Sequence, residues 1–183
     1  MTPHTFVVTV EDEPGVLNRV ASLFRRRNYN IDSLTVGRTE QPGVSRMTIV
    51  VPTDEAGAHR VAANLYKLVN VISVQDITNS PAVFRDLAMI KVAATAESRT
   101  HIMQLVDVFR ARVVDVAPDS LIIEITGTED KIDGLLEVLR PYGVLEMVRT
   151  GRVAMARGLR SATAHASSDP AVTADDDNVF HSV

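Results

Sequence analysis

The stretch that decides the fold is EDEPGVLNRVASLFRRRNYNIDSL, which runs from Glu11 to Leu34. Four apolar residues recur in it at helical spacing: Leu17, Val20, Ala21 and Phe24. The spacing predicts a helix that begins near Pro14 and ends near Asn28. Gly15 would then lie in the first turn, where a glycine costs about 1 kcal/mol relative to alanine.

Two explanations of this helix start follow from the residues. In the first, Asp12 or Glu13 caps the helix and Pro14 takes the first helical position, which leaves Gly15 unexplained. In the second, the missing β-carbon at Gly15 lets an anion approach the unpaired N–H groups of the first turn, and Asp12 faces an ammonium group. On the residues alone, plain capping is the simpler of the two.

The first half of the chain reads as strand, helix, strand, strand, helix, strand. Apolar and β-branched runs predict strands at 5–10, 31–36, 47–51 and 71–77, and Val61, Leu65 and Leu68 indicate the second helix. The sequence after the linker Asn79–Pro81 repeats this order without visible sequence similarity. There we expect strands at 87–94, 113–116, 121–125 and 144–148, and helices at 102–109 and 132–139.

A βαββαβ unit forms a four-stranded antiparallel sheet with two helices on one face, the ferredoxin-like arrangement. The predicted fold class is therefore α+β, with two tandem ferredoxin-like units at residues 4–78 and 82–160. One face of each sheet and its edges remain uncovered, so we expect an oligomer. The remaining segment, 161–183, has four Asp and no Lys or Arg, and its composition predicts a disordered tail.

Composition excludes several classes. The 183 residues carry a formal net charge of −4, which argues against nucleic acid as the main partner. Segment 161–183 itself carries −4, so residues 1–160 are formally neutral and the acidity gives no clue to what the folded part binds. The chain has no Cys and hence neither disulfides nor thiolate metal sites. The N-terminus lacks the pattern of a signal peptide, and no apolar run is long enough to span a membrane. We expect a cytoplasmic protein with no membrane partner.

Catalytic chemistry has no support in the sequence. The histidines are scattered and are interpreted as solvent-exposed: His4, His59, His101, His165 and His181. We find neither metal-ligand spacing nor a nucleophile elbow nor a phosphate-binding glycine loop. The run Glu11–Glu13 suits a helix start and Arg25–Arg27 a helix end, and Asp175–Asp177 read as solvated residues. We therefore predict no catalytic residues and no metal or cofactor in this chain.

Several segments together carry a family resemblance. VEDEPGVLNRVASLF, RRRNYNIDSLTVG and SRMTIVV resemble the small regulatory subunit of acetolactate synthase (acetohydroxyacid synthase), and the first unit resembles its ACT domain. The resemblance continues through KLVNVISVQDIT, RDLAMIKV and TGRVAMARG. It covers roughly residues 4–160 and excludes the tail. The segment YNIDSLTV followed by SRMTI is the specific signature.

The resemblance implies a regulatory subunit of branched-chain amino acid biosynthesis. Such subunits stimulate a separate catalytic large subunit, which carries thiamine diphosphate, magnesium and FAD. They also confer feedback inhibition by a branched-chain amino acid, usually L-valine, bound where two ACT domains of a homodimer meet. The effector-binding residues implied here are Asp12, Gly15, Val16 and Leu17, with Asn30 and Ile31 supplied by the neighbouring subunit.

Two positions depart from the family pattern. Asp12 often corresponds to Asn and Pro14 to another residue, which leaves the orientation of the ligand and the strength of the valine response open. A preference for leucine or isoleucine also stays open, since one methylene changes affinity by only ~1 kcal/mol. Two further classes remain as alternatives: a free-standing ACT-type amino-acid sensor that acts on another protein, and a small ferredoxin-like enzyme.

Overall fold

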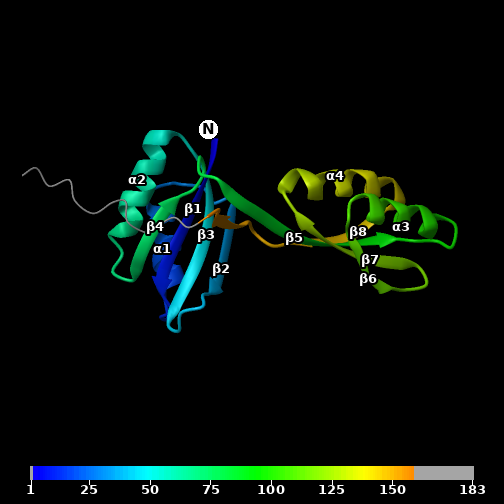
Figure 1. Ribbon diagram of the computed structural model, residues 1–183, viewed down its shortest axis with the longest axis horizontal. Coiled ribbons are helices and arrows are strands. Elements are labelled where there is room, and N and C mark those ends of the chain that lie inside the picture. Colours follow the sequence, from blue (N-terminus) through cyan, green and yellow to red (C-terminus); the bar gives the residue numbers. More distant parts are fainter. Residues whose placement is uncertain (1, 159–183) are drawn as a thin grey trace, which may run out of the picture.

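The computed structural model describes residues 2–158 of the chain, which form two βαββαβ units joined end to end (Figure 1). The predicted fold class is confirmed for these residues. The predicted disordered tail at 161–183 lies outside the described residues.

The first unit is one antiparallel sheet in the order β2-β3-β1-β4, with both helices on one face. Its elements are β1 (Thr2–Glu11), α1 (Val16–Arg26), β2 (Ser33–Arg38), β3 (Val44–Thr53), α2 (Glu55–Tyr66) and β4 (Val71–Asp76). β1 lies in the centre, paired with β3 on one side and β4 on the other, and its run Phe6–Val8 is buried on both faces of the sheet. β2 is an edge strand, paired only with β3 among the described strands.

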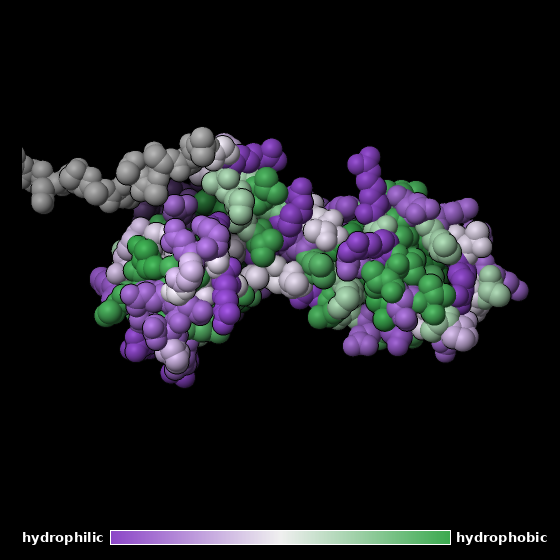
Figure 2. Space-filling model, turned by 60° about the horizontal axis from the view of Figure 1, so that its bottom comes forward, coloured by the Kyte–Doolittle hydropathy of each residue, from purple (hydrophilic) through white to green (hydrophobic). Residues whose placement is uncertain are grey.

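The second unit has the same plan, with its four strands in the order β6-β7-β5-β8. Its elements are β5 (Ala82–Ala93), α3 (Ser98–Val108), β6 (Arg112–Val116), β7 (Ser120–Gly127), α4 (Glu129–Leu139), the short 3-10 helix η1 (Arg140–Tyr142) and β8 (Val144–Arg149). Figure 2 turns forward the sheet face that carries no helix, where apolar side chains gather among charged ones. Met89 and the paired Val148 lie on this face, 40% and 54% exposed.

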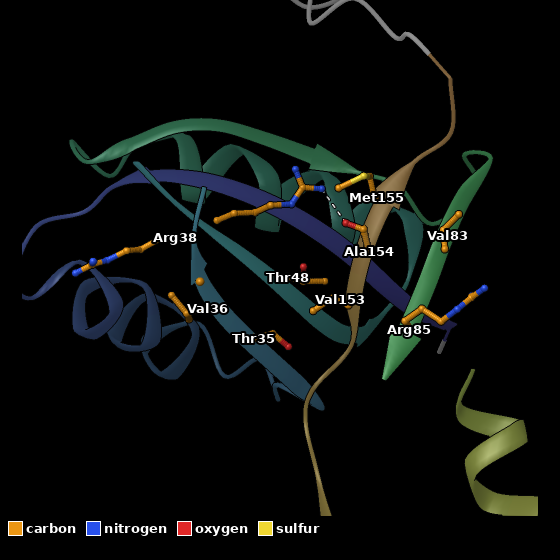
Figure 3. Close-up of a pocket in the computed structure, with 11 residues that line it drawn as sticks. Thr35, Val36, Arg38, Thr48, Val83, Arg85, Val153, Ala154 and Met155 are labelled. Carbon is orange, nitrogen blue, oxygen red and sulfur yellow. Dashed lines mark hydrogen bonds between the residues drawn. The ribbon is translucent and has the colours of Figure 1, made fainter. Parts of the chain in front are cut away.

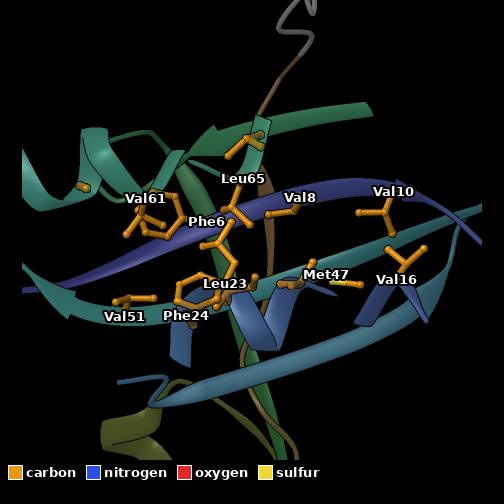
Figure 4. Packing of buried hydrophobic residues seen from close by; sticks show 14 residues of the cluster. Phe6, Val8, Val10, Val16, Leu23, Phe24, Met47, Val51, Val61 and Leu65 are labelled. Carbon is orange, nitrogen blue, oxygen red and sulfur yellow. The ribbon is translucent and has the colours of Figure 1, made fainter. Parts of the chain in front are cut away.

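Each sheet buries its core against its own helices. In the first unit, Phe6, Val8 and Val10 of β1 alternate toward α1 and α2, as strand geometry requires, and are at most 1% exposed. In Figure 4, Phe6 and Val8 lie toward Phe24 of α1 and Leu65 of α2, and Val10 lies beside Val16 at the start of α1. A separate cluster fills the second unit; its members include Ile90, Ile123, Ile132 and Leu135.

A ninth strand, β9 (Val153–Ala156), follows the second unit and returns to the first. The sequence patterns did not predict this strand. It pairs antiparallel with the first residues of β5, Ala82–Arg85. This two-stranded ribbon lies on the helix-free face of the first sheet, where Ala154 is buried beside Val7 and Ile77. The first sheet is therefore partly covered on both faces.

Candidate functional site at the β1–α1 turn

The turn between β1 and α1 is built around Gly15. Gly15 is the N-cap residue of α1, with φ 85° and ψ −4°. This left-handed conformation strongly favours glycine over residues with a β-carbon. A β-carbon at Gly15 would meet no atom within 4 Å, so the space above the turn is open. The glycine is thus explained first by the backbone, and its open surroundings leave room for a ligand.

The predicted helix start was wrong by about two residues. α1 begins at Val16, so Pro14 lies in the turn and does not take the first helical position. No side chain caps the helix, because the left-handed Gly15 occupies the capping position. The simpler explanation from the sequence, capping by Asp12 or Glu13, is therefore also wrong.

Asp12 is engaged elsewhere. Its carboxylate accepts a hydrogen bond from Ser45 Oγ at 3.1 Å and lies 3.5 Å from Arg38 Nε. The Arg38 side chain is 88% exposed, so this ion pair is weak in water. No short-range pattern in the sequence points to either partner. Both come from strands that the hairpin β2–β3 brings beside the turn.

The first turn of α1 leaves backbone donors open. Val16 N donates to Glu13 O at 3.4 Å, and Arg19 N donates to Gly15 O at 3.0 Å. The amides of Leu17 and Asn18 have no such backbone acceptor among the described residues. The first turn contains no acidic residue that would neutralise the positive helix end. The arrangement suits a carboxylate or another small anion.

The six predicted site residues do not all contribute side chains here. The side chain of Val16 is 4% exposed and belongs to the core, so only its backbone faces the turn. Leu17 is 44% exposed and available. Asn30 is exposed and donates to Asp32 Oδ1 at 2.9 Å, whereas Ile31 is half-buried against the core.

Within one chain, Asn30 and Ile31 lie far from Gly15. Both precede Ser33, which pairs with Val50, whereas the other end of β2, Arg38, pairs with Ser45 near the β1–α1 turn. The two ends of this strand are about 17 Å apart at a rise of ~3.3 Å per residue. A site that uses both groups therefore needs two chains.

The histidine interpretation needs one correction. His59 and His101 are exposed, but His4 is only 4% exposed and its Nδ1 lies 2.8 Å from Asp76 Oδ2. His165 and His181 lie outside the described residues. Within residues 2–158, no cluster of three or more His, Cys, Asp or Glu is arranged to hold a metal ion. No helix in the same range has the length and apolarity needed to cross a membrane.

Comparison with known protein families identifies the class of each of the two units. Residues 6–73 match the family described as the AHAS small subunit-like ACT domain, so the first unit is an ACT domain. Residues 85–158 match the family described as the small subunit of acetolactate synthase.

Full-length relatives then give the family. A probable acetolactate synthase small subunit from Archaeoglobus fulgidus is 53% identical over 85% of this chain and 97% of its own length. The acetolactate synthase small subunit of Mycolicibacterium smegmatis is 50% identical over 86% of this chain and 92% of its own length. The crystal structure of the small subunit from Thermotoga maritima has a TM-score of 0.81 and 39% identity, over 87% of this chain and all of that one. The chain belongs to the family of acetolactate synthase small subunits, which supports a regulatory role.

Proposed function

We propose that this chain is the regulatory subunit of acetolactate synthase in branched-chain amino acid biosynthesis. It binds and stimulates the catalytic large subunit in the cytoplasm and makes it sensitive to feedback inhibition by valine. The observation that carries the effector part is the open, glycine-capped start of α1 beside an edge strand of an ACT domain. Thiamine diphosphate, magnesium and FAD belong to the catalytic partner in this proposal.

The effector carboxylate binds at the start of α1. The amides of Leu17 and Asn18 donate to it, and the positive helix end adds attraction worth about 0.3–1 kcal/mol. Gly15 contributes the absence of a side chain over this spot. The apolar side chain of the effector packs on the exposed Leu17, while the buried Val16 supports the helix from below.

The effector ammonium group has two candidate partners, Asp12 and Asn30. Asp12 is ionisable and close to the turn, but Arg38 competes for it. Because Arg38 is exposed, releasing it costs little. The partner's Asn30 supplies a side-chain oxygen, and the partner's Ile31 adds apolar contact.

A homodimer seam explains how distant residues form one site. β2 is the exposed edge of the first sheet, and an exposed edge tends to pair with another strand. Antiparallel pairing of two β2 strands around a two-fold axis sets the Ser33 end of one strand beside the Arg38 end of the other. Asn30 and Ile31 of one copy then approach the β1–α1 turn of the other.

Inhibition follows from linkage. Valine stabilises the dimer arrangement to which it binds more tightly. If this arrangement activates the large subunit less, the enzyme is inhibited. A coupling free energy of about 1–3 kcal/mol gives a useful response.

An acetolactate assay of the purified large subunit, with and without this chain and across a valine titration, tests the role. We expect stimulation without valine and its loss as valine rises. Absence of both stimulation and co-purification with the large subunit would instead favour a free-standing amino-acid sensor.

Gly15→Asp tests the effector site, with Gly15→Asn as its matched control. Asp and Asn are similar in size and both tolerate the left-handed backbone, so the pair isolates the charge. We expect Gly15→Asp to abolish valine binding in isothermal titration calorimetry, and Gly15→Asn to weaken it less. Wild-type valine affinity in Gly15→Asp would rule this site out.

A further inference from the structure

A groove of about 310 Å³ lies between the first sheet and the β5–β9 ribbon (Figure 3). One of its lining residues, Arg38, also pairs with Asp12 of the β1–α1 turn. The groove walls are Val36 of β2, Val83 of β5, and Val153 and Met155 of β9. Val36, Val153 and Met155 are 42%, 47% and 66% exposed, so apolar surface remains open to water.

The groove is also basic. Arg38, Arg46 and Arg85 line it, and no acidic side chain from the described part of the chain does. Arg46 donates to Ala154 O at 2.8 Å and Arg85 to Phe84 O at 2.7 Å, so these two guanidinium groups are held by neutral carbonyl oxygens. Among residues 2–158, the one ion pair of Arg38 is its weak pair with Asp12. A fitting occupant combines apolar and acidic side chains.

The chain itself contains such a segment. Asp175, Asp176 and Asp177 are followed closely by Val179 and Phe180, within a region that has no Lys or Arg. The family match ends at residue 158, so this segment lies beyond the shared small-subunit body. We propose that residues 175–180 occupy the groove of their own chain, with Phe180 on the apolar walls and the carboxylates near the arginines.

Reach and local concentration favour binding within the same chain. Gly158 lies two positions after the end of β9 and three positions after the groove residue Met155. The roughly 17 residues from Gly158 to Asp175 extend up to about 55 Å. A tether of this kind gives an effective concentration in the millimolar range, so even a contact with millimolar affinity is about half occupied. The proposal does not depend on the effector site.

The chain has no tryptophan, so a single introduced tryptophan can report the contact by its fluorescence. In full-length Phe180→Trp, we expect blue-shifted emission that is independent of protein concentration. About 1 M salt shortens the Debye length to ~3 Å and should shift the emission toward that of exposed tryptophan. A Ser168→Trp chain, with the reporter outside the proposed segment, should show exposed emission throughout.

Two substitutions at similar exposure test the groove in the Phe180→Trp background. Met155→Glu changes the groove, and Val116→Glu changes a 63% exposed position on β6 of the second unit. We expect only Met155→Glu to abolish the blue shift. The proposal would be overturned if Phe180→Trp with an unchanged groove showed the emission of an exposed tryptophan. It would also be overturned if both substitutions changed the emission equally. A blue shift that grows with protein concentration would also overturn it, because a second copy would then be the partner.

Discussion

Arg152 and Thr5 are in contact although 147 positions separate them in the chain: Arg152 Nη1 donates to Thr5 Oγ1 at 3.2 Å. The same guanidinium donates to Glu129 Oε2 at 3.2 Å and stacks 5.4 Å from the Phe84 ring centroid. Glu129 also lies 3.9 Å from Arg149, whose guanidinium is bound to the buried Asp86. One side chain thus links the first sheet, the ribbon and the start of α4.

Arg152→Ala should loosen the junction between the units. We expect it to lower the free energy of unfolding by about 1–2 kcal/mol, because it removes charged hydrogen bonds of which part is exposed. Urea unfolding measures this. If the junction also carries the proposed regulation, valine inhibition weakens while valine affinity stays unchanged.

The control for this change is Arg112→Ala. Arg112 pairs with Glu124 within the second unit and its side chain is 73% exposed. We expect a loss below about 1 kcal/mol and normal valine inhibition. Equal effects of the two substitutions would contradict a special role for Arg152.

Gly151→Ala should displace β9 from the first sheet. An added β-carbon would lie 2.6 Å from both Ser33 Oγ and Thr35 Oγ1 and 3.1 Å from the backbone oxygen of Leu34. We expect a loss of about 1–3 kcal/mol from this overpacking. Hydrogen exchange of the Arg152 amide, which donates to Ser33 Oγ at 2.7 Å, should become faster. Unchanged exchange there would show that the contact is not maintained in solution.

Gly15→Ala should cost stability through the backbone alone. The substitution forces a β-carbon into φ 85° but creates no clash, so we expect a loss of about 1 kcal/mol. Gly37→Ala is the matched control, since its β-carbon also meets nothing within 4 Å and its φ is not left-handed. Chemical denaturation of the two variants isolates the conformational term. If Gly37→Ala lost as much as Gly15→Ala, φ would not be the cause.

Acid should weaken the first unit through Asp76. Burial raises the pKa of Asp76, but hydrogen bonds from Thr78 and the contact with His4 outweigh burial and lower the pKa below its ordinary 3.8. The folded state therefore favours the carboxylate, and this stabilisation is present above about pH 3.8 and lost as pH falls through the folded pKa.

Urea unfolding of wild type and Asp76→Asn between about pH 2.5 and 6 measures the effect. We expect the variant to be less stable near pH 6 and the difference to shrink below about pH 3.8. Asp115→Asn, on an exposed strand position, controls for the general loss of a negative charge. A difference that stays constant with pH would contradict the role of Asp76.

The sequence by itself determined the two βαββαβ units, because apolar strand runs such as Phe6–Val10 and apolar residues at helical spacing are local patterns. It misplaced part of the buried helix face: Leu17 and Ala21 are exposed, and α1 buries Val16, Val20, Leu23 and Phe24. It also singled out Gly15, although it placed this residue inside the first helical turn, whereas Gly15 is the residue that precedes the helix. These features depend on neighbours a few residues away.

Only the tertiary structure decided the rest. β9 has four residues and no usable period; it forms because β5 offers an edge and Ala154 is buried beside Val7. Likewise, His4 is buried through Asp76, 72 positions away, and Arg38 reaches Asp12 through the β2–β3 hairpin. Such contacts depend on which distant segments the packed sheets bring together, and no local pattern contains that information.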